Sequence, residues 1–272
     1  MLVSVIITTK NEEKNIGNCL RSIKGQTYPQ DQIEIIVVDN QSDDRTKEIA
    51  KEYTDLIFDK GPERSAQRNF GVEKSSGDYF MYLDADMILH NDVIFDCVKK
   101  IENDDEIIGL YVSEIVTGKK FFSKVRRFER SFYDATVVDC ARFIKKESFL
   151  EVEGFDENLT GPEDWDLDKK LRGIGKLELV KTPIFHNEAE FELGFYLKKK
   201  GYYSQKFDDY ISKWGKDDAD LKKQFGIGYR FFGIFVENGK WRKLLAYPCL
   251  TFGMYFLRGL VGVVFVFRKK KD

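Results

Sequence analysis

Short apolar runs alternate with helical patterns along the N-terminal part of the chain. Runs rich in β-branched residues predict buried strands at 3–9, 33–38, 56–58 and 79–83. Between them, helical patterns predict one helix that begins near Ile16, a second that begins after Asp43 or Asp44 and runs through Tyr53, and a third from Ser65 to Lys74. Strands that alternate with helices in this way predict an α/β fold with a mainly parallel sheet and crossover helices.

Beyond Asp86 the pattern is less regular. It predicts helices over 93–101 and 165–171 and strands over 107–112, 137–144 and 177–180, whereas the basic, aromatic stretch 118–130 gives no clear prediction. On the helix 165–171, Trp165 is expected to pack, and Asp166 and Asp168 are expected to face solvent. We expect a catalytic domain over 1–190, a helical acceptor-side extension over 191–243, and an apolar segment with a basic tail over 244–272.

Composition limits the classes of function. With 272 residues, 42% of them hydrophobic, the chain can bury one substantial core. Its net charge of -2 and pI of about 5.9 argue against a nucleic-acid-binding protein. The four cysteines form no close pair, which disfavours a zinc ribbon or a disulfide framework, and the N-terminus lacks a signal-peptide layout.

Polar residues follow three of the predicted strands. Thr8 and Glu12 lie at the end of the first strand, Asp39 ends the second, and Asp84 and Asp86 end the fourth. In open α/β sheets, ligands bind beyond the carboxyl ends of the strands. Two carboxylates separated by one residue suit a hard cation such as Mg²⁺ or Mn²⁺ together with a diphosphate. For Asp39 alone, a role in closing a turn or capping a helix remains an equal alternative.

No glycine-rich phosphate loop follows the first strand. Its absence from the sequence counts against P-loop NTPases and dinucleotide-binding dehydrogenases.

Four motifs occur in order and together resemble the family 2 glycosyltransferases. They are VSVIITTKNEE, VVDNQSDDRT, SAQRNFGVEKSSGDYFMYLDADM and GFDENLTGPEDWDLDKKLRGIG, and the resemblance covers residues 1 to about 190. It implies the GT-A fold and a nucleotide-sugar donor.

The resemblance also implies roles on the donor side. Thr8 and Glu12 match positions that line the nucleotide pocket, and Asp39 matches the acid that reads the base edge. Arg68 matches the nucleotide-contacting arginine of the A-R-N-x-G element, and Asp84 is the first acid of the D-x-D motif.

Three further residues match positions at the reacting centre. Asp86, the second acid of D-x-D, matches the usual metal ligand, and Asp164 matches the catalytic base. His186 lies where many members of the family place a histidine near the metal or diphosphate, although an ordinary structural role remains open. One base and a one-step displacement imply inversion at the anomeric carbon. The sequence lacks a Q-x-x-R-W motif, which favours transfer of a single sugar.

The apolar segment 244–267 is close to the length that spans a bilayer. Pro248 and Arg258 interrupt it, which favours an interfacial or re-entrant helix pair, with the basic residues 268–271 at anionic headgroups. The aromatic run 225–236 could join the same surface. The alternative is a buried helix that packs on the catalytic domain.

These features predict an inverting, metal-dependent glycosyltransferase at the cytoplasmic face of the membrane, peripheral or monotopic. Its acceptor is expected to be lipid-linked, such as a polyprenyl phosphate or a lipid-linked glycan, because basic and aromatic residues lie side by side over 191–214. A soluble or cell-envelope polysaccharide acceptor is the alternative. The sequence counts against two other classes. TTKNEEKNIG is a poor match to the glycine-rich, basic signature of a nucleotidyltransferase, and the presence of Asp84, Asp86 and Asp164 counts against a non-catalytic nucleotide-sugar-binding protein on the same scaffold.

Overall fold

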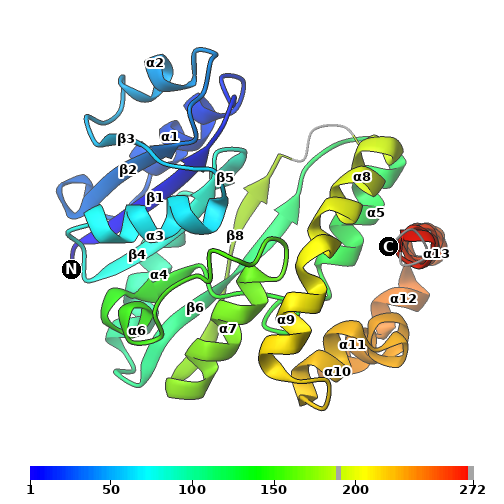
Figure 1. Ribbon diagram of the computed structural model, residues 1–272. Coiled ribbons are helices and arrows are strands. Elements are labelled where there is room, and N and C mark those ends of the chain that lie inside the picture. Colours follow the sequence, from blue (N-terminus) through cyan, green and yellow to red (C-terminus); the bar gives the residue numbers. More distant parts are fainter. Residues whose placement is uncertain (188–190, 269–272) are drawn as a thin grey trace.

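A mixed sheet of eight strands forms the centre of the protein (Figure 1). The computed structural model describes residues 1–187 and 191–268. The strand order is β3-β2-β1-β4-β7-β6-β8-β5. The strands are β1 (Val3–Thr9), β2 (Ile33–Asp39), β3 (Ile57–Asp59), β4 (Tyr79–Asp84), β5 (Met87–Leu89), β6 (Ile107–Val116), β7 (Phe143–Lys145) and β8 (Lys176–His186).

The first four strands in the sheet order pair in parallel, as the sequence predicts. β1 pairs with β2 on one side and with β4 on the other, and β2 pairs with β3. The register sets Thr8 beside Asp84 and Thr9 beside Asp39. The polar residues at the ends of these strands are therefore brought to one edge of the sheet.

Helices cover both faces of the sheet. They are α1 (Ile16–Lys24), α2 (Thr46–Ala50), α3 (Arg64–Lys74), α4 (Val93–Glu102), α5 (Phe121–Arg130), α6 (Lys146–Glu151) and α7 (Glu163–Ile174). Alternate residues of β1 belong to two separate apolar cores: Val5 and Ile7 pack with α1 and α4, and Ile6 packs with α3 and α7. Because both faces are covered, β1 is apolar along most of its length.

The second half of the sheet differs from the mainly parallel prediction. β7 is antiparallel to β4 and β6, and β5 is antiparallel to β8, whereas β6 and β8 are parallel. The strand predicted over 137–144 is wrong for most of its length, because only β7 at its end is extended. Asp139 accepts hydrogen bonds from Ala135 N and Arg130 Nη2, which fold the preceding residues into a buried turn. The short strand β5 has no counterpart among the predictions.

Two helices also differ from the prediction. α2 ends at Ala50 rather than continuing to Tyr53, although Asp44 does accept a hydrogen bond from Thr46 N at its start. The stretch without a prediction contains α5, an amphipathic helix that buries Val125 and Phe128.

The expectation that Asp166 and Asp168 face solvent is wrong. Both are buried in α7. Asp166 accepts hydrogen bonds from Trp214 Nε1 at 2.8 Å and Lys213 Nζ at 2.9 Å, and Asp168 accepts one from Arg172 Nε at 2.8 Å. The C-terminal helices therefore cover a side of α7 that the local sequence pattern leaves exposed. Trp165 packs among aromatic rings of these helices, as expected.

The chain after the sheet is helical. It contains α8 (Leu193–Tyr203), α9 (Phe207–Trp214), α10 (Ala219–Phe225), α11 (Ile234–Val236), α12 (Arg242–Ala246) and α13 (Pro248–Arg268). Short 3₁₀ turns occur at Gln30–Gln32, Ser204–Lys206 and Glu237–Gly239, and a π-helical turn occurs at Tyr229–Gly233.

The last helix, α13, packs against α5 and α8 (Figure 1). Met254 and Leu257 are buried in this contact. Arg258 is also buried: its Nε donates to Glu129 Oε1 of α5 at 2.9 Å, and its guanidinium lies 4.6 Å from the centre of the Phe235 ring. The arginine that interrupts the apolar segment is thus paired within the protein. None of the helices in the described ranges combines the length and the apolarity needed to cross a bilayer.

Candidate active site

Asp84 is the centre of a hydrogen-bonded group at the ends of β1 and β4. Thr8 Oγ1 donates to Asp84 Oδ1 at 3.2 Å, and Arg68 Nη2 of α3 donates to the same oxygen at 3.1 Å. Burial alone would raise the pKa of Asp84, but the guanidinium groups of Arg68 and Arg64 hold it well below its usual range. Asp84 therefore stays ionised at neutral pH.

Arg68 joins the D-x-D motif to the start of α7. Its side chain is only 1% exposed, and Nη1 donates to Asp164 Oδ1 at 2.9 Å. The guanidinium also lies over the Tyr82 ring, 4.5 Å from its centre. Arg68 is thus enclosed by protein groups and holds two of the predicted site residues, Asp84 and Asp164, in one assembly. Its contact with a nucleotide stays a prediction.

A second arginine, Arg64, was missed in the sequence. It donates to Asp84 Oδ2 at 3.5 Å and to Glu163 Oε1 at 3.2 Å, and its guanidinium lies 5.3 Å from the centre of the Tyr203 ring. Its side chain is 33% exposed, so it is more accessible than Arg68. The signal was present, since residues four apart on a helix share a face.

Asp164 and Glu163 begin α7 and differ in environment. The side chain of Asp164 is 31% exposed, whereas Glu163 is buried and accepts a hydrogen bond from Gly161 N. Burial and the neighbouring Asp164 raise the pKa of Glu163. Gly161 has a φ of +101°, and a side chain there would collide with the backbone of Tyr203. The loop before α7 is therefore packed directly against the end of α8.

Asp86 and His186 meet across β5 and β8. His186 Nε2 lies 3.2 Å from Asp86 Oδ2, and His186 Nδ1 lies 2.8 Å from Glu114 Oε1 of β6. Burial alone would lower the pKa of His186, but its hydrogen bonds to Asp86 and Glu114 raise it to about 10. The other oxygen of Asp86, Oδ1, is buried and has no hydrogen-bond partner among the described residues.

The residues at this point fit a divalent cation. Within 1–187 and 191–268, no group of three or more His, Cys, Asp and Glu side chains gathers to hold an ion. Mg²⁺ is nevertheless commonly bound by one or two carboxylates, with water and substrate phosphates completing its shell. The unpartnered Oδ1 of Asp86 offers such a ligand, with His186 Nε2 beside it.

Glu12 and Asp39 lie at the same edge of the sheet. Glu12 Oε2 accepts from Asn15 Nδ2 at 2.7 Å, and Asn15 Oδ1 in turn accepts from Asn187 Nδ2 at 3.0 Å. Burial raises the pKa of Glu12. Asp39 is buried and accepts hydrogen bonds from Ser42 N at 2.6 Å and Ser42 Oγ at 2.5 Å. Asp39 thus closes a turn, one of the two roles that the sequence allowed. Its contact with the base of a nucleotide stays a prediction.

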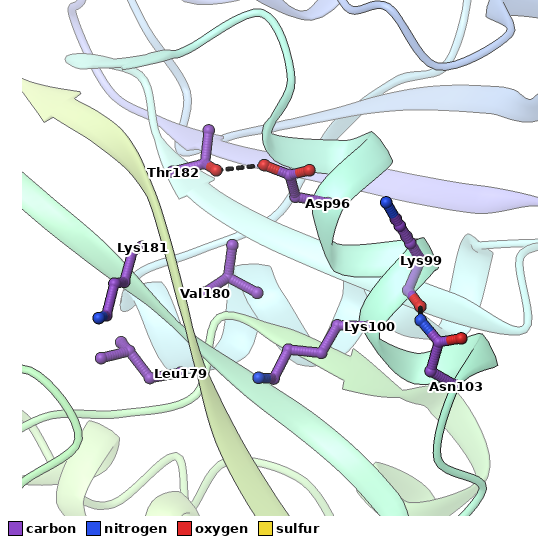
Figure 2. A pocket seen from close by; sticks show the side chains of 8 residues that line it. All are labelled: Asp96, Lys99, Lys100, Asn103, Leu179, Val180, Lys181 and Thr182. Carbon is purple, nitrogen blue, oxygen red and sulfur yellow. Dashed lines mark hydrogen bonds between the residues drawn. The ribbon is translucent and has the colours of Figure 1, made fainter.

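A shallow pocket lies elsewhere, between α4 and β8 (Figure 2). It has a volume of about 320 Å³ and is lined by Asp96, Lys99, Lys100, Asn103, Leu179, Val180, Lys181 and Thr182. None of the predicted site residues lines it, so it is not the candidate active site.

Comparisons with known sequences point to one family. The family model described as glycosyl transferase family 2 matches residues 4–150. The chain is 44% identical over 95 residues to the glycosyltransferase AglE of Haloferax volcanii, covering 32% of this chain and 31% of that protein. It is 29% identical over 210 residues to the glycosyltransferase GlyA of Streptococcus pneumoniae, covering 75% of this chain and 27% of that protein. The chain thus matches less than a third of the length of either relative.

Solved structures share the fold. The S. aureus TarS fragment 1–349 in complex with UDP-GlcNAc superposes with a TM-score of 0.58 at 18% identity, covering 94% of this chain and 80% of that one. The mannosyltransferase PcManGT from Pyrobaculum calidifontis, in complex with GDP-Man and Mn²⁺, gives a TM-score of 0.62 at 18% identity, covering 98% and 79%. At these identities the likeness shows the fold, which is the GT-A fold. Because the family model matches more than half of its 272 residues, the chain belongs to glycosyl transferase family 2.

Proposed function

We propose that this protein transfers one sugar from a nucleotide-sugar to a membrane lipid-linked acceptor, with inversion at the anomeric carbon. The observation that carries the proposal is the assembly of Asp84, Arg68 and Asp164 by direct hydrogen bonds, at the sheet edge where Asp86 meets His186. A cation ligand and arginines suit the charge of a departing nucleoside diphosphate, and a candidate base suits an attacking acceptor.

We favour a UDP-sugar as the donor, with GDP-mannose as the alternative. Relatives support both, since TarS is solved with UDP-GlcNAc and PcManGT with GDP-Man. Thr8, Glu12 and Asp39 would line the nucleotide side of the site. Arg64, with its partly exposed guanidinium, is better placed than the buried Arg68 to reach the diphosphate. Arg68 would then act by fixing Asp84.

Asp86 and His186 would hold Mg²⁺ or Mn²⁺. When bound, such an ion neutralises the charge that develops on the leaving diphosphate. PcManGT is solved with Mn²⁺, which supports a divalent cation in this fold. The unpartnered oxygen of Asp86 supports the same assignment from this chain alone.

Asp164 would act on the acceptor. Its carboxylate is partly exposed and lies at the start of α7, where it can accept a proton from an attacking hydroxyl. If the acceptor is a phosphate, it is already ionised, and Asp164 would orient it instead. Glu163 is buried and engaged by Arg64, so it is the weaker candidate.

A membrane acceptor is supported by the outer side of the C-terminal helices. Large apolar side chains are exposed there, among them Ile227, Phe232, Leu245, Phe252, Phe256 and Val263. The basic residues 269–271 that would meet anionic headgroups lie outside the described residues. We place the protein at the cytoplasmic face of the membrane, peripheral or monotopic, with 191–243 on the acceptor side and 244–272 as the membrane-associating segment.

A polysaccharide acceptor is the second candidate. Two partial relatives are named for wall polymers: the minor teichoic acid biosynthesis protein GgaB of Bacillus subtilis, and the poly(ribitol-phosphate) β-N-acetylglucosaminyltransferase TarP of Staphylococcus aureus.

The proposal is tested by a donor screen. UDP-sugars and GDP-mannose are incubated with the protein, Mn²⁺ and either a membrane lipid extract or a soluble wall polymer, and released nucleoside diphosphate is measured. We expect release with one donor that depends on both metal and lipid extract. Release with the polymer alone would favour the second candidate. Binding without turnover under any condition would favour a non-catalytic protein.

A further inference from the structure

We infer that Glu114 is a positioning residue for the cation site: it fixes the ring of His186 so that Nε2 faces the ion held at Asp86. The inference rests on the proposed function, since it presumes that Asp86 and His186 hold the metal. Neither the sequence motifs nor the family resemblance points to Glu114.

Glu114 reaches His186 across the paired strands β6 and β8. The register sets Val116 beside His186 and Glu114 beside Ile184, and an irregularity lies between Val112 and Glu114. The Glu114 side chain contacts the ring from the side opposite Asp86: Oε1 is 2.8 Å from Nδ1, and Asp86 Oδ2 is 3.2 Å from Nε2.

Glu114 is itself held by two arginines. Its Oε2 accepts from Arg130 Nη2 at 3.1 Å and from Arg142 Nη2 at 3.2 Å, and its side chain is almost fully buried. Because arginine only donates, Oε2 carries no proton, and the two positive charges beside it match an ionised carboxylate. An ionised carboxylate can only accept a hydrogen bond. A proton is therefore kept on Nδ1, and a ring that gave up its other proton to bind a cation would present the lone pair of Nε2.

This arrangement has the form of a metal ligand with a supporting partner. A histidine that binds a metal through one nitrogen usually donates its other N–H to a carboxylate or carbonyl, which sets the tautomer and the ring orientation. A histidine with only a structural role has no need to direct Nε2 at a carboxylate whose other oxygen is buried without a hydrogen-bond partner. Asp86 Oδ1 is such an atom among the residues that the structure covers.

The substitution Glu114→Gln tests the inference because it replaces the carboxylate oxygen at His186 Nδ1 with an amide group. The amide has only one oxygen, and the two arginines, which can only donate, require that oxygen. The amide NH₂ then faces Nδ1 and favours the tautomer with its proton on Nε2, which opposes metal binding. Asp139→Asn is the matched control, since Asp139 is a buried carboxylate that also accepts from Arg130 and contacts the ring of neither histidine.

The first measurement is Mn²⁺ affinity by electron paramagnetic resonance, with Mn²⁺ alone and with Mn²⁺ plus UDP. We expect Glu114→Gln to weaken binding by roughly 10–100-fold, the usual effect of losing such a partner. Asp139→Asn should leave the affinity unchanged. Wild-type affinity in Glu114→Gln, or an equal loss in Asp139→Asn, would overturn the inference.

The second measurement reports the tautomer directly. The chain contains only two histidines, His90 and His186, so a His90→Gln background leaves one imidazole to observe by ¹⁵N NMR. In the Mg²⁺–UDP form we expect the proton on Nδ1, and we expect Glu114→Gln to move it toward Nε2. An unchanged tautomer would overturn the inference even if metal binding falls.

His186→Ala separates this inference from the assignment on which it rests. If His186→Ala binds Mn²⁺ as tightly as wild type, His186 is not a ligand, and both the metal assignment and the role of Glu114 fail. If His186→Ala weakens binding and Glu114→Gln does not, the ligand assignment stands and only the role of Glu114 fails.

Discussion

Arg68 donates a hydrogen bond to Asp164 at 2.9 Å, and the same guanidinium holds Asp84 at 3.1 Å. The start of α7 and the end of β4 are thereby fixed to one buried cation from α3. A shift of either carboxylate would leave part of a buried guanidinium unpaired, which is costly. The candidate base and the D-x-D motif are thus held at a constant separation, as in-line transfer requires.

Asp164→Asn is expected to lower kcat by ~10²–10⁴-fold if the acceptor is a hydroxyl, because the proton then lacks a base. The amide oxygen can still accept from Arg68, so donor affinity, measured by calorimetry, should persist. A phosphate acceptor would show a smaller loss. Asp156→Asn, at a carboxylate held by Lys213 outside this group, serves as the control. Wild-type kcat in Asp164→Asn would show that the base lies elsewhere.

Asp86→Ala is expected to abolish turnover and metal-dependent nucleotide binding while leaving the fold intact. Its side chain is 22% exposed, and among the described residues its hydrogen-bond partner is His186, so the substitution removes one hydrogen bond and a small side chain. Circular dichroism and Mn²⁺ titration with UDP provide the measurements. The control is Asp92→Ala, which removes an exposed carboxylate slightly later in the chain. It should retain turnover and metal-dependent nucleotide binding. Full turnover in Asp86→Ala at ordinary metal concentration would rule out the assignment.

Asp39→Ala is expected to weaken donor binding more than it slows the chemical step, because a contact with the base contributes equally to ground and transition states. Donor KM should rise with kcat nearly unchanged. Asp39 also closes the turn at Ser42. Ser42→Ala therefore serves as the control: it removes the hydroxyl contact and keeps the carboxylate. If Ser42→Ala reproduces the whole effect, Asp39 acts through the turn and not on the base.

Arg258→Met is expected to destabilise the protein by about 3–5 kcal/mol, because it leaves the buried carboxylate of Glu129 without one of its cations. Urea unfolding gives the free energy. The double variant with Glu129→Gln should lose less than the sum of the two single losses, since the residues are in direct contact. Additive losses would mean that the pair does not hold α13 on α5.

Phe252→Ser together with Leu245→Ser is expected to reduce sedimentation with anionic liposomes without lowering the unfolding midpoint. These side chains lie on α13 and α12 and are 76% and 74% exposed. Removal of 244–272 should also release the protein from membranes. That truncation would uncover the buried face of α5 as well, so the serine pair is the cleaner test. Unchanged sedimentation of the serine pair would place the membrane contact elsewhere.

Local sequence patterns were sufficient where strands alternate regularly with helices, because such crossover connections predict parallel pairing. The apolar runs of β1, β2 and β4 predict the parallel half of the sheet, and their ends place Thr8, Asp39 and Asp84 at one edge. The antiparallel half was not predictable in this way, because β5 and β7 are only three residues long and no regular alternation of strands and helices leads to them.

Glu114 was missed because its partners lie in other elements of the fold. It is the one charged residue of strand β6, and its partners are Arg130, Arg142 and His186. Nothing in the neighbourhood of Glu114 shows that these groups surround it. A buried acid within an apolar run was the one signal available, since such an acid is rare unless it is paired.

The pairing of Asp86 with His186 joins residues 100 positions apart, and that of Arg68 with Asp164 joins residues 96 apart. Contacts of such long range form only after the intervening chain has ordered, and they slow folding. A nascent chain that has emerged only through β5 therefore carries the D-x-D motif without the groups that complete its site. A ligand that needs both halves binds the finished fold alone and stabilises it by mass action. Donor and cation would thus also govern how long the folded protein survives a protease.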